Sequence, residues 1–409
     1  MKIGIIGAGA SGMFAAITAA KQGADVTLIE KKDRIGKKIL ATGNGKCNFT
    51  NNAMNVFDFR SQYKGIFIDY ISQFNKNDVI SFFQDAGMLT KEKNGYYYPR
   101  SEQASTVLDL LRLQLKTYKV TILTESHPLS IQKKKKSFEI LLNNNEKLFF
   151  DRIILACGSF AGEKKQDDFS GYTYAKSFGH TLVPIVPALV QVRAKGKDFK
   201  SIAGVRCDAN IKLYIDNKLT TEEFGELQLT DYGISGIPVF QLSRYVSYGV
   251  YEKRNVTATI DFLPEYSNEN WQAFVETKWK HSPKNITVEE FFQGFLNKKL
   301  NLMFLKIAGI KAETPINQLK FQKIQQVITT MKCWKIDIEG TNPFENAQVC
   351  AGGVSMDEIT LEMESKLVPG LFFTGELLDV DGRCGGYNLQ WAWTSGYLAG
   401  KYAASKKIY

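Results

Sequence analysis

The chain opens on a pattern of apolar and polar positions that predicts a strand, a turn, a helix and a second strand. A short apolar run covers Ile3 to Ile6, small and apolar residues follow up to Ala20, and a second apolar run leads from Asp25 to Glu30. Short apolar runs that flank a helix-length segment are typical of parallel βαβ units. The N-terminal region therefore predicts the start of a doubly wound α/β domain.

The turn between these elements carries a glycine fingerprint. Gly7, Gly9 and Gly12 have the spacing GxGxxG, and Glu30 ends the second run. In such units the glycines allow a tight turn, close approach of a pyrophosphate and close helix packing, while the acid binds an adenosine ribose. A glycine-rich turn without a ligand is the alternative, but the strand, the helix and the acid all favour a dinucleotide site. The residues expected to line it are Gly7, Ala8, Gly9, Ala10, Ser11, Gly12, Glu30 and Lys31.

Apolar spacing further along the chain predicts a mixture of helices and strands. Helices are expected at 78–86 and 101–116, with Ser101 as an N-cap and Asn94-Gly95 as a hairpin turn between them. Strands are expected at 119–123, 137–142, 147–150 and 152–156. The last strand ends on Ala156, Cys157 and Gly158, small residues that suit the point where a parallel strand meets a ligand.

The middle of the chain has a different character. Strand-like stretches at 210–215, 228–230 and 257–262 give way to a helical stretch from about 271 to 335. After residue 342 the small residues and apolar runs of the first domain return, with a strand at 371–374 and a helix that opens at Gly385-Gly386. We expect an FAD-binding domain over 1–189 and 343–409, interrupted by a β-barrel-like subdomain at 190–270 and a basic helical subdomain at 271–342.

Charge adds a candidate partner. The net charge of the 409 residues is +10, and residues 271–335 hold eleven lysines against four glutamates, a local charge of +7. This helical face is either an ordinary lysine-rich surface or a surface that binds anions such as nucleic acid. For the run Lys133 to Lys136, a solvated hairpin is the favoured interpretation over a nucleic-acid patch.

Cysteine usage and hydropathy narrow the class of protein. The six cysteines show neither CxxC pairs nor zinc-ligand spacing, so we expect a reducing, cytoplasmic compartment and no metal. No uncharged apolar run reaches the roughly eighteen residues that a membrane span needs. A second GxGxxG is absent from the sequence, so a nicotinamide donor is expected to bind only transiently.

Five separated motifs together resemble one family. They are Gly7 to Gly12 with Glu30, the loop Gly36 to Asn51, Thr230 to Gly236, Ala351 to Val354, and Gly375-Glu376 through Gly385 to Trp393. In this order they resemble the BaiN/YhiN-like family of FAD-dependent flavoproteins from end to end. The resemblance implies a glutathione-reductase-type Rossmann FAD domain, interrupted by a small β-barrel and a helical bundle.

The resemblance also implies how FAD lies. Thr42 to Asn48 would pass the flavin side of the cofactor, Glu376 would lie near the ribityl chain, and Gly386 to Leu389 would place backbone amides at the flavin N1 and C2 carbonyl. Many related flavoproteins carry Asp where this chain has Glu376. The further cofactor-binding residues expected are Lys38, Thr42, Gly43, Gly45, Cys47, Asn48, Gly375, Glu376, Gly386, Tyr387, Asn388 and Leu389.

Family members reduce polarised C=C bonds in bile-acid enones or in ribosomal RNA uridines, and another group oxidises amines such as aminoacetone. Reduction of a C=C bond needs a proton donor beside the flavin. Cys47 is the first candidate, and Tyr387 and Tyr232 are weaker ones, although a packing role is the favoured interpretation of each. Cys384 is a further thiol near the ring, and the three histidines are expected to be structural.

The leading hypothesis is reduction of uridine in ribosomal RNA to dihydrouridine, with electrons from NADH or NADPH. The basic helical stretch would then hold RNA phosphates. The first alternative is a reductase or oxidase of a small molecule, such as a steroid-like enone, a quinone or an amine. A further alternative is a non-catalytic RNA-binding protein that FAD stabilises.

Overall fold

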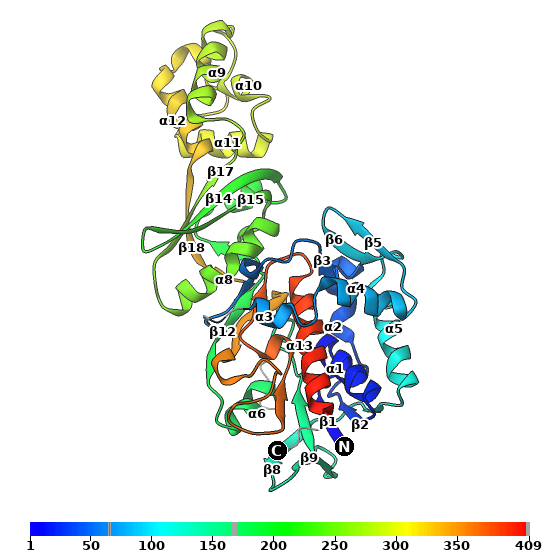
Figure 1. Cartoon of the computed structure of the whole chain (residues 1–409). Coiled ribbons are helices and arrows are strands. Elements are labelled where there is room, and N and C mark those ends of the chain that lie inside the picture. The colour runs from blue at the N-terminus through cyan, green and yellow to red at the C-terminus, as the bar shows by residue number, and fades with distance from the viewer. Residues whose placement is uncertain (64, 66, 165–169, 406–409) are drawn as a thin grey trace. The chain divides into compact units, whose positions relative to one another are not determined.

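The computed structural model describes residues 1–63, 65, 67–164 and 170–405. The chain forms two compact units, one built from residues 1–185 and 349–409 and the other from residues 186–348. Figure 1 shows the chain in colours that run from blue at the N-terminus to red at the C-terminus. Each unit is described by itself below.

A parallel five-stranded sheet forms the centre of the first unit. Its strand order is β20-β11-β1-β2-β7, and every neighbouring pair is parallel. The strands are short and carry the buried apolar runs that the sequence indicates, because both faces of such a sheet are covered. Their bounds are β1 (Lys2–Ile6), β2 (Asp25–Ile29), β7 (Thr121–Leu123), β11 (Arg152–Leu155) and β20 (Leu371–Phe373).

Helix α1 (Ala10–Lys21) packs against the C-terminal helix α13 (Tyr387–Ala404), so the blue and red helices lie side by side in Figure 1. A Cβ atom on Gly396 would lie 2.5 Å from the carbonyl oxygen of Ser11, and one on Gly400 would lie 2.4 Å from that of Ala15. Only glycine at these two positions lets the helix backbones approach so closely.

The other helices of this unit are α2 (Lys37–Leu40), α3 (Ile68–Ile71), α4 (Lys76–Asp85), α5 (Ala104–Thr117) and α6 (Gly171–Ser177). The expectation that Ser101 caps α5 is wrong. Gln103 occupies the N-cap without a side-chain bond, and the Ser101 hydroxyl lies 2.7 Å from that of Thr106. Helix α4 has the better cap, since Asn75 and Asp78 form a capping box.

Within the described residues, four small sheets accompany the central sheet of the first unit. Strands β5 (Thr90–Lys93) and β6 (Tyr96–Pro99) form the hairpin predicted around Asn94-Gly95, and β3 (Thr50–Asn51) joins them. An antiparallel sheet contains β8 (Pro128–Lys133), β9 (Phe138–Leu142) and β10 (Lys147–Phe150), with the lysine run in the predicted hairpin. Strand β4 (Phe59–Arg60) pairs with β21 (Asp381–Gly382). Strands β12 (Leu182–Ala188) and β19 (Val349–Val354) pair where the chain leaves for the second unit and returns.

The second unit contains a closed barrel with the strand order β13-β16-β15-β14-β17-β18. Its strands are β13 (Val192–Ala194), β14 (Arg206–Ile215), β15 (Lys218–Leu229), β16 (Gly233–Ser235), β17 (Val256–Asp261) and β18 (Trp334–Thr341). Its helices are α7 (Phe199–Ile202), α8 (Ile237–Tyr251), α9 (Asn268–His281), α10 (Val288–Phe292), α11 (Lys298–Ile307) and α12 (Phe321–Lys332).

The expectation of helix up to residue 335 is wrong at its end. Residues from Trp334 onward form strand β18, in which Trp334, Ile336 and Ile338 are buried and alternate with exposed residues. This period of two is the signature of a strand with one buried face.

Candidate active site

The glycine turn after β1 forms a cradle with one open side. Gly7 has a φ of 104°, and a Cβ there would lie 2.3 Å from the carbonyl oxygen of Ala156. A Cβ on Gly12 would lie 1.9 Å from the carbonyl oxygen of Gly7, whereas one on Gly9 would meet no atom within 4 Å. Gly7 and Gly12 therefore serve close packing, and Gly9 leaves space above the start of α1. The amides of a helix's first turn lack intrahelical partners and attract anions.

Glu30 is held firmly beside this turn. One carboxylate oxygen accepts the Ala8 amide at 2.8 Å, and the other accepts the Lys32 amide at 2.9 Å. A carboxylate oxygen has more than one lone pair, so each can still accept a hydroxyl donor. The arrangement suits a ribose, as the sequence predicts.

The end of β11 lies against the same turn. Cys157 Sγ donates to the Ile6 carbonyl oxygen at 3.4 Å. Burial raises the pKa of the Cys157 thiol to about 12, and the neighbouring Glu30 raises it further. Gly158 has a φ of 72° and open space where a Cβ would be. Ala156, Cys157 and Gly158 thus form one wall of the cradle, with Cys157 as a neutral packing residue.

The loop after α2 has an unusual backbone. Gly43, Asn44, Gly45 and Cys47 all have positive φ angles between 53° and 80°. This conformation folds the loop back on itself, so that Asn48 lies against Gly43. A Cβ on Gly43 would lie 2.9 Å from the Asn48 amide nitrogen. The Thr42 hydroxyl donates to the Ile39 carbonyl oxygen at 2.6 Å. The Cys47 side chain is fully buried, and burial raises the pKa of its thiol to about 11, although a hydrogen bond with Thr42 opposes the shift.

Two buried acceptors of this region lack a partner. The Asn48 Oδ1 and Glu376 Oε1 atoms are buried and accept no hydrogen bond from any described residue. The other oxygen of Glu376 lies 2.5 Å from Lys38 Nζ. A buried acceptor without a donor costs about 1–3 kcal/mol, so such atoms point to a missing partner. Groups that carry hydroxyl or N–H donors, such as a ribityl chain and an isoalloxazine ring, would supply it.

The start of α13 approaches the same loop. Gly386 has a φ of 92°, and a Cβ there would lie 2.8 Å from the Thr50 carbonyl oxygen and 2.9 Å from Asn48 Oδ1. The Asn388 side chain exchanges hydrogen bonds of 2.8 and 2.9 Å with the backbone of Gly382, so it fixes the turn that leads into the helix. Leu389 is half-buried in the following turn.

The three predicted proton donors are divided between the two units. Cys47 and Tyr387 belong to the first unit, and the Tyr387 ring meets Phe59 edge to face at 6.0 Å. Burial raises the pKa of Tyr387 to about 12. Tyr232 belongs to the second unit, where its hydroxyl accepts from Asn342 Nδ2 at 3.2 Å and its ring lies 5.4 Å from the Arg193 guanidinium.

The structure also reveals neighbours of Glu376 that the sequence analysis missed. The buried Tyr172 hydroxyl lies 3.5 Å from the Glu376 carbonyl oxygen, and burial raises its pKa well above the usual value. Cys350 is buried nearby, and burial raises its pKa to about 12, with Glu376 adding to the shift. Tyr172 belongs to none of the sequence motifs, so no local pattern in the sequence indicates that it lies beside Glu376.

Within the described residues, no three His, Cys, Asp or Glu side chains gather where they could hold a metal ion. In the same part of the chain, no helix is both long and apolar enough to cross a membrane. His180 bonds Glu358 and Ser365 at 2.8 Å each and is buried, as expected of a structural histidine.

Fold and site together define a flavin-dependent oxidoreductase built on a Rossmann FAD-type domain, which confirms the predicted fold class and enzyme class. The chain belongs to the HI0933-like protein Rossmann domain family, whose profile matches residues 1–402. The resemblance stated from the motifs is therefore confirmed, and the non-catalytic alternative is set aside.

Two relatives and one solved structure are similar to the chain over most of its length. It is 44% identical over 408 residues to the 3-dehydro-bile acid delta(4,6)-reductase of Clostridium scindens, covering 99% of each chain. It is 30% identical over 401 residues to the ribosomal RNA dihydrouridine synthase of Escherichia coli, covering 96% of this chain and 95% of the relative. The 3-ketosteroid-delta4-(5alpha)-dehydrogenase of Rhodococcus jostii is 15% identical with a TM-score of 0.47, covering 99% of this chain and 96% of that one.

Proposed function

We propose that the enzyme binds FAD and reduces a C=C bond conjugated to a carbonyl group, with NADH or NADPH as a transient electron donor. The observation that carries the FAD assignment is the pair of partnerless buried acceptors, Asn48 Oδ1 and Glu376 Oε1, on the path between the glycine cradle and α13. Bound FAD supplies a flavin N5 that takes up and delivers a hydride.

The chain's own residues would bind and orient the cofactor. The first turn of α1 would hold the pyrophosphate, and Glu30 would bind the adenosine ribose. Glu376 and Asn48 would accept hydrogen bonds from the ribityl chain and the flavin ring. Gly386, Tyr387, Asn388 and Leu389 open α13, whose N-terminal amides stabilise negative charge. Lys38 would orient Glu376 through their 2.5 Å contact.

Proton delivery is assigned to Cys47 first and Tyr387 second. Both side chains carry their proton at neutral pH, because burial raises the pKa of Cys47 to about 11 and that of Tyr387 to about 12. Tyr232 stays a third candidate from the second unit. A general acid must reach the carbon next to the one that accepts the hydride.

The first substrate candidate is uridine in ribosomal RNA, whose C5=C6 bond is conjugated to the C4 carbonyl. A lysine surface on the second unit favours it. The exposed lysines there that have no ion-pair partner among the described residues include Lys280, Lys311, Lys320, Lys323 and Lys335. Phosphate contacts by such lysines would hold an RNA while a base is extruded from its stack.

The second candidate is a small steroid-like enone. The relative named as a bile acid reductase is 44% identical, against 30% for the relative named as an RNA enzyme. A 3-oxo group conjugated to a C=C bond presents the same polarised alkene as uridine, so one flavin site could serve either substrate.

One experiment separates the candidates. Nucleosides of ribosomal RNA from cells with and without the gene are analysed by mass spectrometry for dihydrouridine. Loss of this nucleoside on deletion, restored by the active protein, would establish the RNA substrate. An unchanged level would sink it, and reoxidation of the NAD(P)H-reduced enzyme by 3-oxo-Δ4 steroids, quinones and aminoacetone would then be compared.

A further inference from the structure

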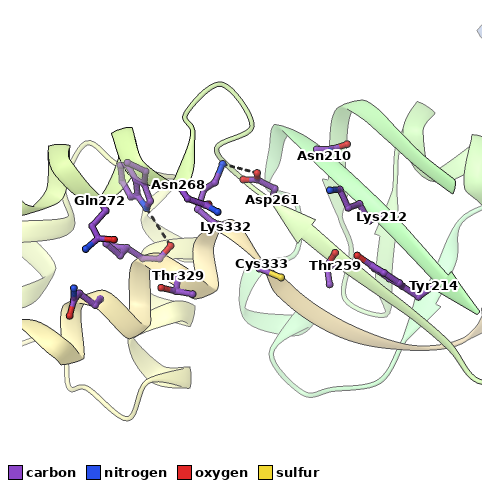
Figure 2. A pocket seen from close by; sticks show the side chains of 13 residues that line it. Asn210, Lys212, Tyr214, Thr259, Asp261, Asn268, Gln272, Thr329, Lys332 and Cys333 are labelled. Carbon is purple, nitrogen blue, oxygen red and sulfur yellow. Dashed lines mark hydrogen bonds and ion pairs between the residues drawn. The ribbon is translucent and has the colours of Figure 1, made fainter. Parts of the chain in front are cut away.

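A polar pocket lies within the second unit, and none of its lining residues belongs to a motif that the proposed function uses. Its volume is about 490 Å³, which is within the usual size range of ligand sites. Helices α9 and α12 supply one side, and strands β14 and β17 supply the other (Figure 2). The lining residues are Asn210, Lys212, Tyr214, Thr259, Asp261, Asn268, Trp271, Gln272, Gln325, Ile328, Thr329, Lys332 and Cys333.

Side-chain amides dominate the lining. Gln272 donates to Glu276 Oε1 at 3.0 Å. Asn210, Asn268 and Gln325 have no side-chain hydrogen-bond partner among the described residues. A carboxamide offers donors and an acceptor together, which matches the edges of nucleobases.

The charge of the lining is positive once its ion pair is taken into account. Asp261 is the one carboxylate among the lining residues, and Lys332 Nζ lies 2.7 Å from it. Lys332 also donates to the carbonyl oxygens of Leu263 and Tyr266 at 2.7 Å each, so it has no donor left. Its charge is cancelled, and the remaining cation in the lining is Lys212.

Lys212 is part of a row across three strands. Lys212 is opposite Thr259, and Thr259 is opposite Lys335 on its other side. Residues directly opposite in a sheet share one face, so two lysines flank a hydroxyl there. The acid nearest Lys212 is Glu222, 3.6 Å away and half exposed to solvent, which makes a weak pair. The row suits a phosphate.

Tyr214 stands two residues after Lys212 on β14, hence on the same face of the strand. Its ring is half-buried and no aromatic neighbour covers it among the described residues. A partly open aromatic ring beside a cation is the usual combination for single-stranded nucleic acid.

We infer that this pocket holds one nucleotide of a single-stranded RNA segment, with its phosphate at Lys212 and Lys335 and its base between Tyr214 and the carboxamides. This inference rests on the first substrate candidate of the proposed function and adds a docking point outside the flavin site. The nucleotide bound here is another nucleotide of the same RNA, not the reduced uridine itself.

The test uses the full-length FAD-bound enzyme and a fluorescein-labelled oligouridylate, with anisotropy as the readout. Tyr214→Ala is expected to weaken binding about tenfold through lost stacking. Lys212→Gln is expected to lower the slope of log Kd against log salt by about one. Lys218→Gln, on the same barrel but outside the pocket, is the matched control and should leave both quantities unchanged.

The outcomes separate this inference from the proposed function. If both pocket variants bind oligouridylate like the wild type, or if uridine monophosphate competes as well as the oligonucleotide, the inferred site is wrong. Dihydrouridine in ribosomal RNA is measured in parallel. If the wild-type enzyme forms none, the substrate proposal fails irrespective of the pocket.

Discussion

At the scale of single residues, the site combines neutral acids with an anchored carboxylate. Burial raises the pKa of Cys47 and of Tyr387, so both stay protonated at neutral pH, while Glu376 pairs with Lys38 through one oxygen and leaves the other without a partner among the described residues. In the proposal, Cys47 and Tyr387 deliver the proton and Glu376 accepts from the cofactor, so substitutions at these residues test proton delivery and the Glu376 contact separately.

Cys47→Ala should leave FAD bound and slow substrate-dependent reoxidation of the flavin about a hundredfold, the usual effect of losing a general acid. Stopped-flow absorbance of the reduced enzyme measures the rate. Cys207→Ala, a half-buried barrel cysteine, is the control. If Cys47→Ala turns over normally and Tyr387→Phe does not, Tyr387 is the acid.

Glu376→Ala should weaken FAD binding about tenfold or more, because it removes the charged acceptor that the proposal places at the ribityl chain. Fluorescence of released FAD gives the dissociation constant. Glu376→Asp should restore most of the affinity, since related flavoproteins carry Asp there. Glu139→Ala removes a carboxylate paired with Lys134 and Lys147 on β9 and should have no effect on FAD.

His180 makes stability depend on pH. Burial lowers the pKa of its imidazole, although Glu358 opposes the shift. The Ser365 oxygen accepts the Leu367 and Val368 amides, so its hydroxyl donates to Nε2 and the neutral ring donates to Glu358. The unfolded chain binds a proton here at a higher pH than the fold does, so stability should fall as pH drops below about 6.5. A plot of Tm against pH between 7 and 5 should be shallower for His180→Gln than for the wild type or His281→Gln.

At the scale of elements, the contact of α1 with α13 fixes the distance between the glycine cradle and the start of α13, which lies against Asn48 of the loop after α2. Gly400→Ala should lower stability by about 1–3 kcal/mol, because its Cβ would lie 2.4 Å from the Ala15 carbonyl oxygen. Gly9→Ala meets open space and should keep the Tm of the apoenzyme while weakening FAD binding. Equal Tm values for the two variants would contradict the assignment of Gly400 to packing and Gly9 to the ligand.

The sequence predicts those elements whose pattern is local. Strands β1 and β2, the hairpin at Asn94-Gly95 and the start of α13 all follow from apolar runs and glycines. The alternation of buried Trp334, Ile336 and Ile338 also predicts a strand, but it follows directly on a long stretch with helical apolar spacing, so the boundary between helix and strand is hard to see in the sequence. Contacts between distant segments were not readable, since Gly396 meets Ser11 and Asn48 meets Gly386 only after the fold has formed.

At the scale of the whole molecule, the chain is one enzyme built from two compact units. All the expected FAD residues belong to the first unit, and the polar pocket belongs to the second. The composition gives the net charge of +10, but it does not show which lysines are available to bind an anion. Ion pairs such as Lys306 with Asp198 and Lys298 with Glu289 neutralise part of the lysine surface.

The pairing of β12 with β19 has a consequence for inheritance. The strand that leaves the first unit and the strand that returns to it are neighbours in one sheet. The two ends of the inserted segment 186–348 therefore lie close together. A gene segment that encodes such a cassette can be replaced or remodelled while both flanks still join. Descendants of one ancestral flavoprotein could thus acquire new substrates by changing the cassette and keep the machinery of hydride transfer as it was.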